Sequence, residues 1–286
     1  MAGAEKGARI VIQFLPGAMR WAWELADKSA WKQDAWRASA GWGKRAYLLL
    51  RRWWQTAPAE KVNQIDDLVD RPELAEFRAV SLERERCFLV GGHVGPTAAA
   101  LNLFSAANWP FRTLGSPDRG RRNDDTLIAL TADPYRPVRT LVEHLKNGAT
   151  IGMMADAPYS REYLPAEFLG RRIQFSAQVP KLLRRYGAPS FWCCPLWRDG
   201  RIVIELARLP DPVDGEPLHE WCRRWFAAYL PRLEAVMRGR PENLVLFAGI
   251  WGHVNPHAIR LRNNMPHRRP VTSHIFRYQT ALAGAA

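Results

Sequence analysis

From residue 86 onward the chain alternates short apolar runs with longer segments of helical character, and this alternation limits its fold more than any other feature. The runs 87–92 and 150–155 are apolar or small almost throughout and have the length of buried strands. The segments 137–146 and 217–237 are long enough for helices. Strands that alternate with helices are typical of α/β folds. We therefore predict an α/β fold, a layered mixed sheet flanked by helices, with a helical N-terminal segment.

Turn residues and glycines set the other expected elements. Further strands are expected at 111–114, 173–175, 191–197 and 202–206. Asp199-Gly200 is a strong turn signal, so the last two strands should pair as a hairpin. Helices are expected at 96–108, 137–146, 176–186 and 217–237, and a last apolar segment at 244–250.

The first sixty residues differ from the rest in composition. Helices are expected at 18–28 and 40–55, and both mix apolar with basic side chains. Seven of the 13 tryptophans lie between residues 21 and 54, and the whole chain has a net charge of +13. Tryptophan beside basic residues suits the headgroup layer of a membrane, where an amphipathic ring and a cation are both stable. The alternative is that these rings simply pack in the core.

These differences predict three parts, a basic-aromatic membrane-surface segment at 1–60, an α/β domain at 61–260 and a basic tail at 261–286. The charge suggests an anionic partner, and we favour a membrane surface because the sequence carries no recognisable nucleic-acid-binding motif. The longest early apolar run, 10–15, is too short to span a bilayer, and no cleavable signal peptide is evident. A peripheral membrane position is therefore expected.

The four cysteines show neither a C-x-x-C spacing nor a framework of paired positions. Cys193 and Cys194 are adjacent in an apolar run, which favours buried free thiols over disulfides or a metal site. Free thiols suit a reducing compartment. We expect neither a metal nor a cofactor.

Two polar residues stand where predicted strands end. His93 follows the run 87–92, and Asp156 follows the run 150–155. Reactive groups in α/β proteins gather beyond the carboxyl ends of the strands. A histidine there can accept a proton near neutral pH, and a carboxylate bonded to its second nitrogen would fix its tautomer. The alternative is a structural histidine at a strand end and an aspartate that caps a turn.

Segment 91–95, Gly-Gly-His-Val-Gly, resembles the first motif of the lipid A lauroyl/myristoyl acyltransferase family, within the lysophospholipid acyltransferase superfamily. Further blocks that resemble those of the family follow in its order. They are Arg136-Pro137-Val138-Arg139, Met153-Met154-Ala155-Asp156, Phe168-Leu169-Gly170, Gln174-Phe175-Ser176, Asp199-Gly200 and Pro241-Glu242-Asn243. The resemblance covers roughly residues 84–247, and the ordered set is more specific than any single motif.

The resemblance implies a glycerolipid-acyltransferase-like fold. It also implies transfer of a fatty acyl group from an acyl carrier protein or coenzyme A thioester to a lipid or lipid-like hydroxyl or amine. The site would lie at the cytoplasmic face of a bacterial inner membrane. His93 would deprotonate the acceptor, and Asp156 would orient His93. Four further residues are implied in substrate binding or oxyanion stabilisation: Gly95, Arg136, Arg139 and Ser176.

The sequence departs from the first motif of the family. Ala98 replaces the acid that stands five positions after the histidine, and no acidic residue occurs between His93 and Asp118. Two interpretations remain open. Either Asp156 supplies the carboxylate, or the chain is a catalytically inactive lipid-binding or scaffold homologue of the same fold.

Overall fold

The computed structural model describes residues 18–56, 69–70, 87–97, 111–115, 127–129, 136–156, 163–246 and 249–250. The predicted tail at 261–286 and most of the predicted helix at 96–108 lie outside these residues. The proposed boundaries near residues 60 and 260 lie outside them as well.

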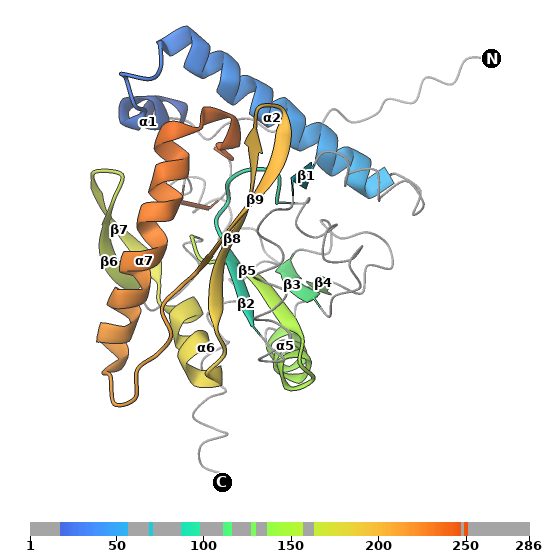
Figure 1. Cartoon of the computed structure of the whole chain (residues 1–286), viewed down its shortest axis with the longest axis vertical. Helices are drawn as coiled ribbons and strands as arrows, with labels where there is room; N and C mark the ends of the chain where they lie inside the picture. Colours follow the sequence, from blue (N-terminus) through green and yellow to red (C-terminus); the bar gives the residue numbers. More distant parts are fainter. Residues whose placement is uncertain are drawn as a thin grey trace, which may run out of the picture.

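Seven strands form one sheet with helices packed around it (Figure 1). Their order across the sheet is β1 (Val69–Asp70), β9 (Arg201–Arg208), β8 (Ser190–Arg198), β2 (Phe88–Gly91), β5 (Thr150–Met154), β3 (Phe111–Gly115) and β4 (Leu127–Ala129). Neighbouring strands are parallel except β8 and β9, which form the predicted hairpin. The predicted α/β fold with a mixed sheet is therefore confirmed.

Strand β2 occupies the middle of the sheet, between β5 and β8, and runs parallel to both. All four of its residues are buried, as expected for an apolar run with a strand on each side. Gly91 pairs with Met154, the last residue of β5, so the two strands end in step. We call this the carboxyl edge of the sheet. Residues that follow β2 and β5 therefore meet there.

The described helices are α1 (Ala18–Leu25), α2 (Gln33–Thr56), α5 (Arg136–Lys146), α6 (Gln178–Tyr186), α7 (Leu218–Gly239) and the short 3-10 helix η3 (Pro241–Asn243). Helices α1, α5, α6 and α7 match the predicted segments closely, α2 begins earlier than predicted, and η3 was not predicted as a helix. Among these described residues, no helix combines the length and the hydropathy that a membrane span requires.

Helix α7 packs on the sheet through aromatic side chains. Trp221, Trp225 and Tyr229 recur every four residues and are fully buried. The rings of Trp225 and Tyr229 stack with centroids 5.1 Å apart. This stripe fixes the helix against the strands that carry the carboxyl edge.

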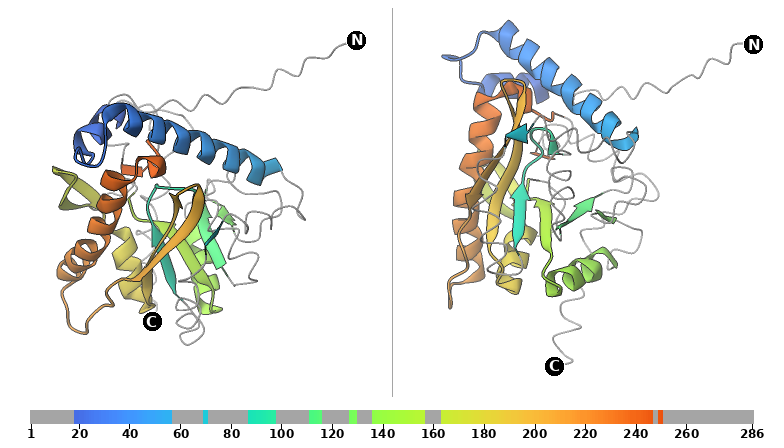
Figure 2. Two further views of the ribbon diagram at one scale, coloured as in Figure 1. Left: turned by 45° about the horizontal axis from the view of Figure 1, so that its top comes forward. Right: turned by 45° about the vertical axis from the view of Figure 1, so that its right-hand side comes forward.

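Helices α1 and α2 lie across the top of the molecule in Figure 1 and also in both views of Figure 2. Helix α2 begins at Gln33, earlier than the predicted start at residue 40. The physical reason is packing, because Trp36 and Ala40, one turn apart, are both buried. The aromatic side chains of this segment are thus partly core, as the alternative interpretation held, whereas Trp42 is 39% exposed.

A second, two-stranded sheet is formed by β6 (Tyr163–Phe168) and β7 (Arg171–Ser176), which pair antiparallel. Only part of β7 was predicted. Pro165 lies within β6 and lacks the backbone donor of an ordinary strand residue, which hides this strand from a pattern search.

The four cysteines, Cys87, Cys193, Cys194 and Cys222, are free and buried, as predicted. Burial raises the pKa of the Cys193 thiol to about 12, and the nearby Cys87 adds to this effect. These thiols therefore behave as apolar core groups.

Candidate active site

The carboxyl edge brings His93 and Asp156 into direct contact. Nδ1 of His93 lies 2.7 Å from Oδ1 of Asp156, and the backbone N–H of His93 donates to Oδ2 over 3.0 Å. One residue therefore binds both carboxylate oxygens. The Asp156 side chain is fully buried, and the His93 side chain is 16% exposed.

This geometry selects one tautomer of a neutral His93. A carboxylate only accepts hydrogen bonds, so Nδ1 carries the hydrogen that Asp156 accepts. The lone pair of the neutral ring then resides on Nε2, which can take a proton from another molecule. The arrangement is that of a general base with an orienting carboxylate.

Electrostatics keep the Asp156 carboxyl ionised. Burial alone would raise the pKa of this carboxyl. The charge of a protonated His93 and the hydrogen bonds from its ring and backbone outweigh that effect and hold the pKa below its ordinary value. Asp156 is thus a carboxylate near neutral pH, as an orienting partner must be.

Helix α7 packs against the backbone that precedes His93. The hydroxyl of Tyr229 donates to the carbonyl oxygen of Gly91 over 2.9 Å, at the end of β2. A Cβ atom at Gly92 would lie 2.5 Å from Leu233 and 3.4 Å from the Tyr229 hydroxyl, so the helix touches the backbone beside His93. Burial raises the pKa of Tyr229 well above its ordinary value, and the charge of Asp156 adds to the effect. The phenol therefore stays protonated and keeps donating.

Gly249 closes one side of the pair. It has a φ of +61°, and a Cβ there would overlap Oδ2 of Asp156 and lie 2.8 Å from Nδ1 of His93. Neither the conformation nor the space accommodates a side chain. Sequence reasoning missed this residue, and the only available signal was a glycine inside the apolar stretch 244–250.

Asn243 ties the loop after His93 to the rest of the fold. Its backbone oxygen accepts from the Gly95 N–H over 2.8 Å, and its side-chain amide bonds both backbone groups of Trp197 at the end of β8. Asn243 is buried, so these bonds are shielded from water. The Pro-Glu-Asn block singled out in the sequence thus helps to position the histidine loop.

Gly95 packs closely against the protein's own backbone. It is buried with a φ of +63°, and the position of a Cβ is taken by the backbone of Pro195 and by the Asn243 side chain. Because Gly95 has no side chain, Pro195 and Asn243 of the protein itself can pack closely against it. The expected part of Gly95 in substrate binding or oxyanion stabilisation stays a prediction.

The two predicted arginines lie on helix α5. Arg136 and Arg139 are exposed on α5, which lies at the bottom of the sheet in Figures 1 and 2, where β5 begins. His93 and Asp156 follow the ends of their strands at the other edge. The role of these arginines in oxyanion stabilisation stays a prediction.

Ser176 is buried at the end of β7, and its Oγ accepts from the N–H of Gln178 over 3.3 Å. The described hydrogen bond of this hydroxyl is thus local to the start of α6.

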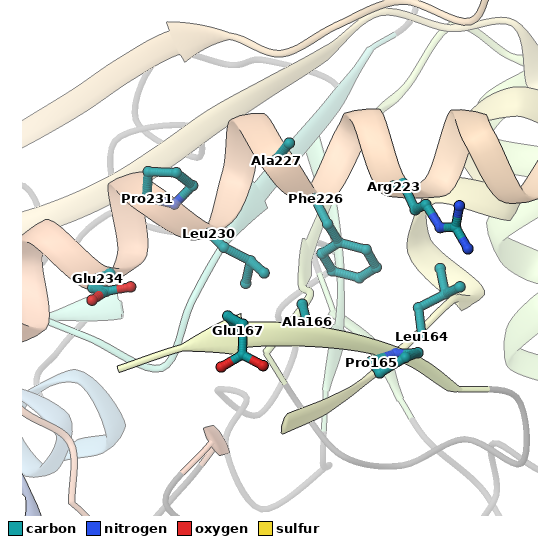
Figure 3. Close-up of a pocket in the computed structure, with 10 residues that line it drawn as sticks. All are labelled: Leu164, Pro165, Ala166, Glu167, Arg223, Phe226, Ala227, Leu230, Pro231 and Glu234. Carbon is teal, nitrogen blue, oxygen red and sulfur yellow. The ribbon is translucent and has the colours of Figure 1, made fainter. Parts of the chain in front are cut away.

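A cavity of about 220 Å³ lies between α7 and β6 (Figure 3). Its walls are mainly apolar, with acidic groups towards one end and a cation at the other. The lining residues are Leu164, Pro165, Ala166, Glu167, Arg223, Phe226, Ala227, Leu230, Pro231 and Glu234. Neither His93 nor Asp156 is among them. The apolar cleft expected beside the pair is not tested, because segments 98–110 and 157–162 lie outside the described residues.

Comparison with known proteins gives one distant similarity to report. No family model matches the chain. The chain is 24% identical over 249 residues to the Vi polysaccharide export protein VexE of Salmonella typhi. The match covers 85% of this chain but only 38% of that protein. The chain is thus a distant relative of part of a longer protein that is named for polysaccharide export.

Proposed function

We propose that this protein transfers a fatty acyl group from an acyl carrier protein or coenzyme A thioester to a hydroxyl or amine of a lipid or lipid-like acceptor at a membrane surface. The observation that carries the proposal is the contact between His93 and the buried Asp156 carboxylate. It supplies a base with a fixed tautomer at the edge of an α/β sheet where catalytic groups gather.

In the proposed reaction, Nε2 of His93 takes the proton from the acceptor as its oxygen or nitrogen attacks the thioester carbonyl carbon. The tetrahedral intermediate collapses, the carbon–sulfur bond breaks, and the departing thiolate takes the proton back from the imidazolium. Asp156 holds the ring and stabilises its positive charge during this sequence. General-base assistance of this kind contributes about 10²–10⁴-fold to the rate.

Two further observations support the proposal. The acid missing at Ala98 leaves the histidine without a partner in its own motif, and Asp156 occupies the place that such a partner needs. The distant relative is named for polysaccharide export, and an exported polymer must cross a membrane. An acceptor at a membrane surface is consistent with that name.

The test is an acyl-transfer assay with the full chain, a labelled acyl carrier protein or coenzyme A thioester, and membrane lipid as acceptor. We expect a labelled lipid that His93→Ala reduces by about 10²–10⁴-fold. His219→Ala is the matched control, because His219 is an exposed histidine on α7. Native turnover in His93→Ala would refute the proposal. A native protein that binds lipid but makes no product would instead support the inactive scaffold.

A further inference from the structure

Helix α2 has two contrasting faces. Its inner face is buried through Trp36, Ala40 and Gly43, spaced by four and three residues. Trp36 packs edge-on against Trp23 of α1, with ring centroids 5.6 Å apart. Further along the helix, Leu50 packs on a core cluster of the sheet. These contacts fix which side of α2 is turned away from the protein.

The outward side combines large apolar and cationic side chains. Trp42, Arg45, Leu49 and Arg52 recur at intervals of three and four residues, and all four are exposed. The Trp42 ring also packs edge-on against Trp197 of β8, with ring centroids 5.3 Å apart, so Trp42 lies at the margin of this side. Leu49 is 68% exposed, the highest value among the large apolar side chains described. The acidic residue of the helix, Asp34, lies in its first turn, so the stretch from Trp42 to Arg52 is basic. We call these four residues the outer face of α2.

The geometry points to an anionic phospholipid surface as the partner of the outer face of α2. Arginines attract anionic headgroups, and Leu49, which lies between Arg45 and Arg52, can enter the boundary of the acyl chains. A nucleic acid would satisfy the arginines but would leave Leu49 in water. The positive charge of the whole protein, +13, acts in the same direction.

A short series of contacts connects helix α2 to the pair of His93 and Asp156. Gly43, on the inner side of α2, touches the backbone of Glu242 so closely that a Cβ would overlap it. The next residue, Asn243, holds the Gly95 N–H, two residues after His93. A docked α2 would therefore hold the pair at a fixed height above the headgroups. This inference deepens the proposed function and rests on it for the nature of the acceptor, but the docking itself does not involve His93.

Vesicle flotation of the full chain tests the docking, with phosphatidylcholine vesicles that contain or lack phosphatidylglycerol. We expect binding only with the anionic lipid, and Leu49→Glu and Arg45→Glu should each weaken it about tenfold or more. Val213→Glu and Arg232→Glu are the matched controls, because Val213 is 58% exposed and Arg232 is exposed, both outside α2. The controls should bind like the native protein.

Four results would overturn the docking inference. In the first, Leu49→Glu and Arg45→Glu bind the anionic vesicles like the native protein. In the second, the two control variants lose as much vesicle binding as Leu49→Glu and Arg45→Glu. In the third, the native protein binds vesicles without phosphatidylglycerol equally well. In the fourth, the chain would bind labelled duplex RNA, with Arg45→Glu defective and Leu49→Glu normal. His93→Ala separates this inference from the proposed function, since it should bind vesicles normally whether or not acyl transfer occurs.

Discussion

Different faces of helix α7 contribute to the carboxyl edge and to the cavity between α7 and β6, here called the groove. Tyr229 and Leu233 of α7 face Gly91 and Gly92, whereas Leu230 lines the groove. At the carboxyl edge, polar groups are buried and held by several hydrogen bonds. The groove offers an open space of about 220 Å³ with mainly apolar walls. His93 and Asp156 therefore lie at the tightly packed carboxyl edge, where packing fixes their geometry, and not among the residues that line the cavity.

The largest expected effect is on the rate of acyl transfer, and it should differ between the carboxylates of Asp156 and Glu167. Asp156→Asn should lower acyl transfer by up to about 10⁴-fold, as much as loss of His93 itself, because the single amide oxygen cannot replace both carboxylate oxygens that His93 binds. The ring must then change tautomer, or its backbone N–H loses its acceptor. Glu167→Gln, the same kind of change in the groove, should leave transfer within about twofold of native. Rates measured under identical donor and acceptor concentrations give the comparison.

Similar losses in both variants would erase the distinction between the two regions and would favour the groove as part of the reaction site. An Asp156→Asn variant with native turnover would show that His93 needs no orienting carboxylate.

The next largest effect is on stability, and it compares two glycines with nearly the same backbone φ angle. Gly249→Ala should destabilise the protein by about 2–5 kcal/mol, because strain at a φ of +61° adds to the overlap with Asp156. Gly170→Ala, on the β6–β7 hairpin, has a φ of +67° but nothing within 4 Å of the new Cβ. It should cost only about 1–2 kcal/mol. Urea unfolding measures both, and equal losses would show that Gly249 does not close the pair.

The sequence allowed the contact between His93 and Asp156 to be predicted because the information is local. Each strand is a contiguous apolar run, each polar residue follows directly, and parallel neighbours end at one edge. The supporting residues are a different matter. Tyr229 bonds Gly91 across 138 positions of the chain, and a helical stripe of buried aromatics does not show which hydroxyl meets which carbonyl.

Sequence order alone does not place the other predicted site residues either. Arg136 and Arg139 were predicted as site residues by their order in the chain, which does not show how far the first turns of α5 lie from the pair. Gly95 was expected to face substrate, but a glycine permits close approach by any neighbour, and here the neighbour is Pro195. The short strands β1 and β4 carry too few residues to show a period of their own.

A smaller effect tests the support that α7 gives. Tyr229→Phe removes the donor to the Gly91 carbonyl and leaves that buried oxygen without this bond. We expect a loss of about 1–3 kcal/mol in urea unfolding and a modest fall in acyl transfer. Tyr163→Phe on β6 is the control, because Tyr163 is exposed, and it should stay within about 0.5 kcal/mol of native. A stable Tyr229→Phe variant would mean that stacking alone holds the helix at the carboxyl edge.

The smallest effect is the dependence of stability on pH. The folded pKa of Asp156 lies below the ordinary aspartate pKa of about 3.9. Its ionised form therefore stabilises the fold fully at pH values above that ordinary pKa, and this contribution is lost as the pH falls through the lowered pKa. The free energy of unfolding should then fall by at most about 1.4 kcal/mol per pH unit for this group. Asp156→Asn lacks the titration, so the native advantage over this variant should shrink between pH 5 and pH 3. Asp27 and Glu216, whose pKa values are lowered mainly by side-chain hydrogen bonds from Ser29 and Arg224, are common to both proteins and cancel. A constant difference across that range would show that the carboxylate gains nothing from His93 in the folded state.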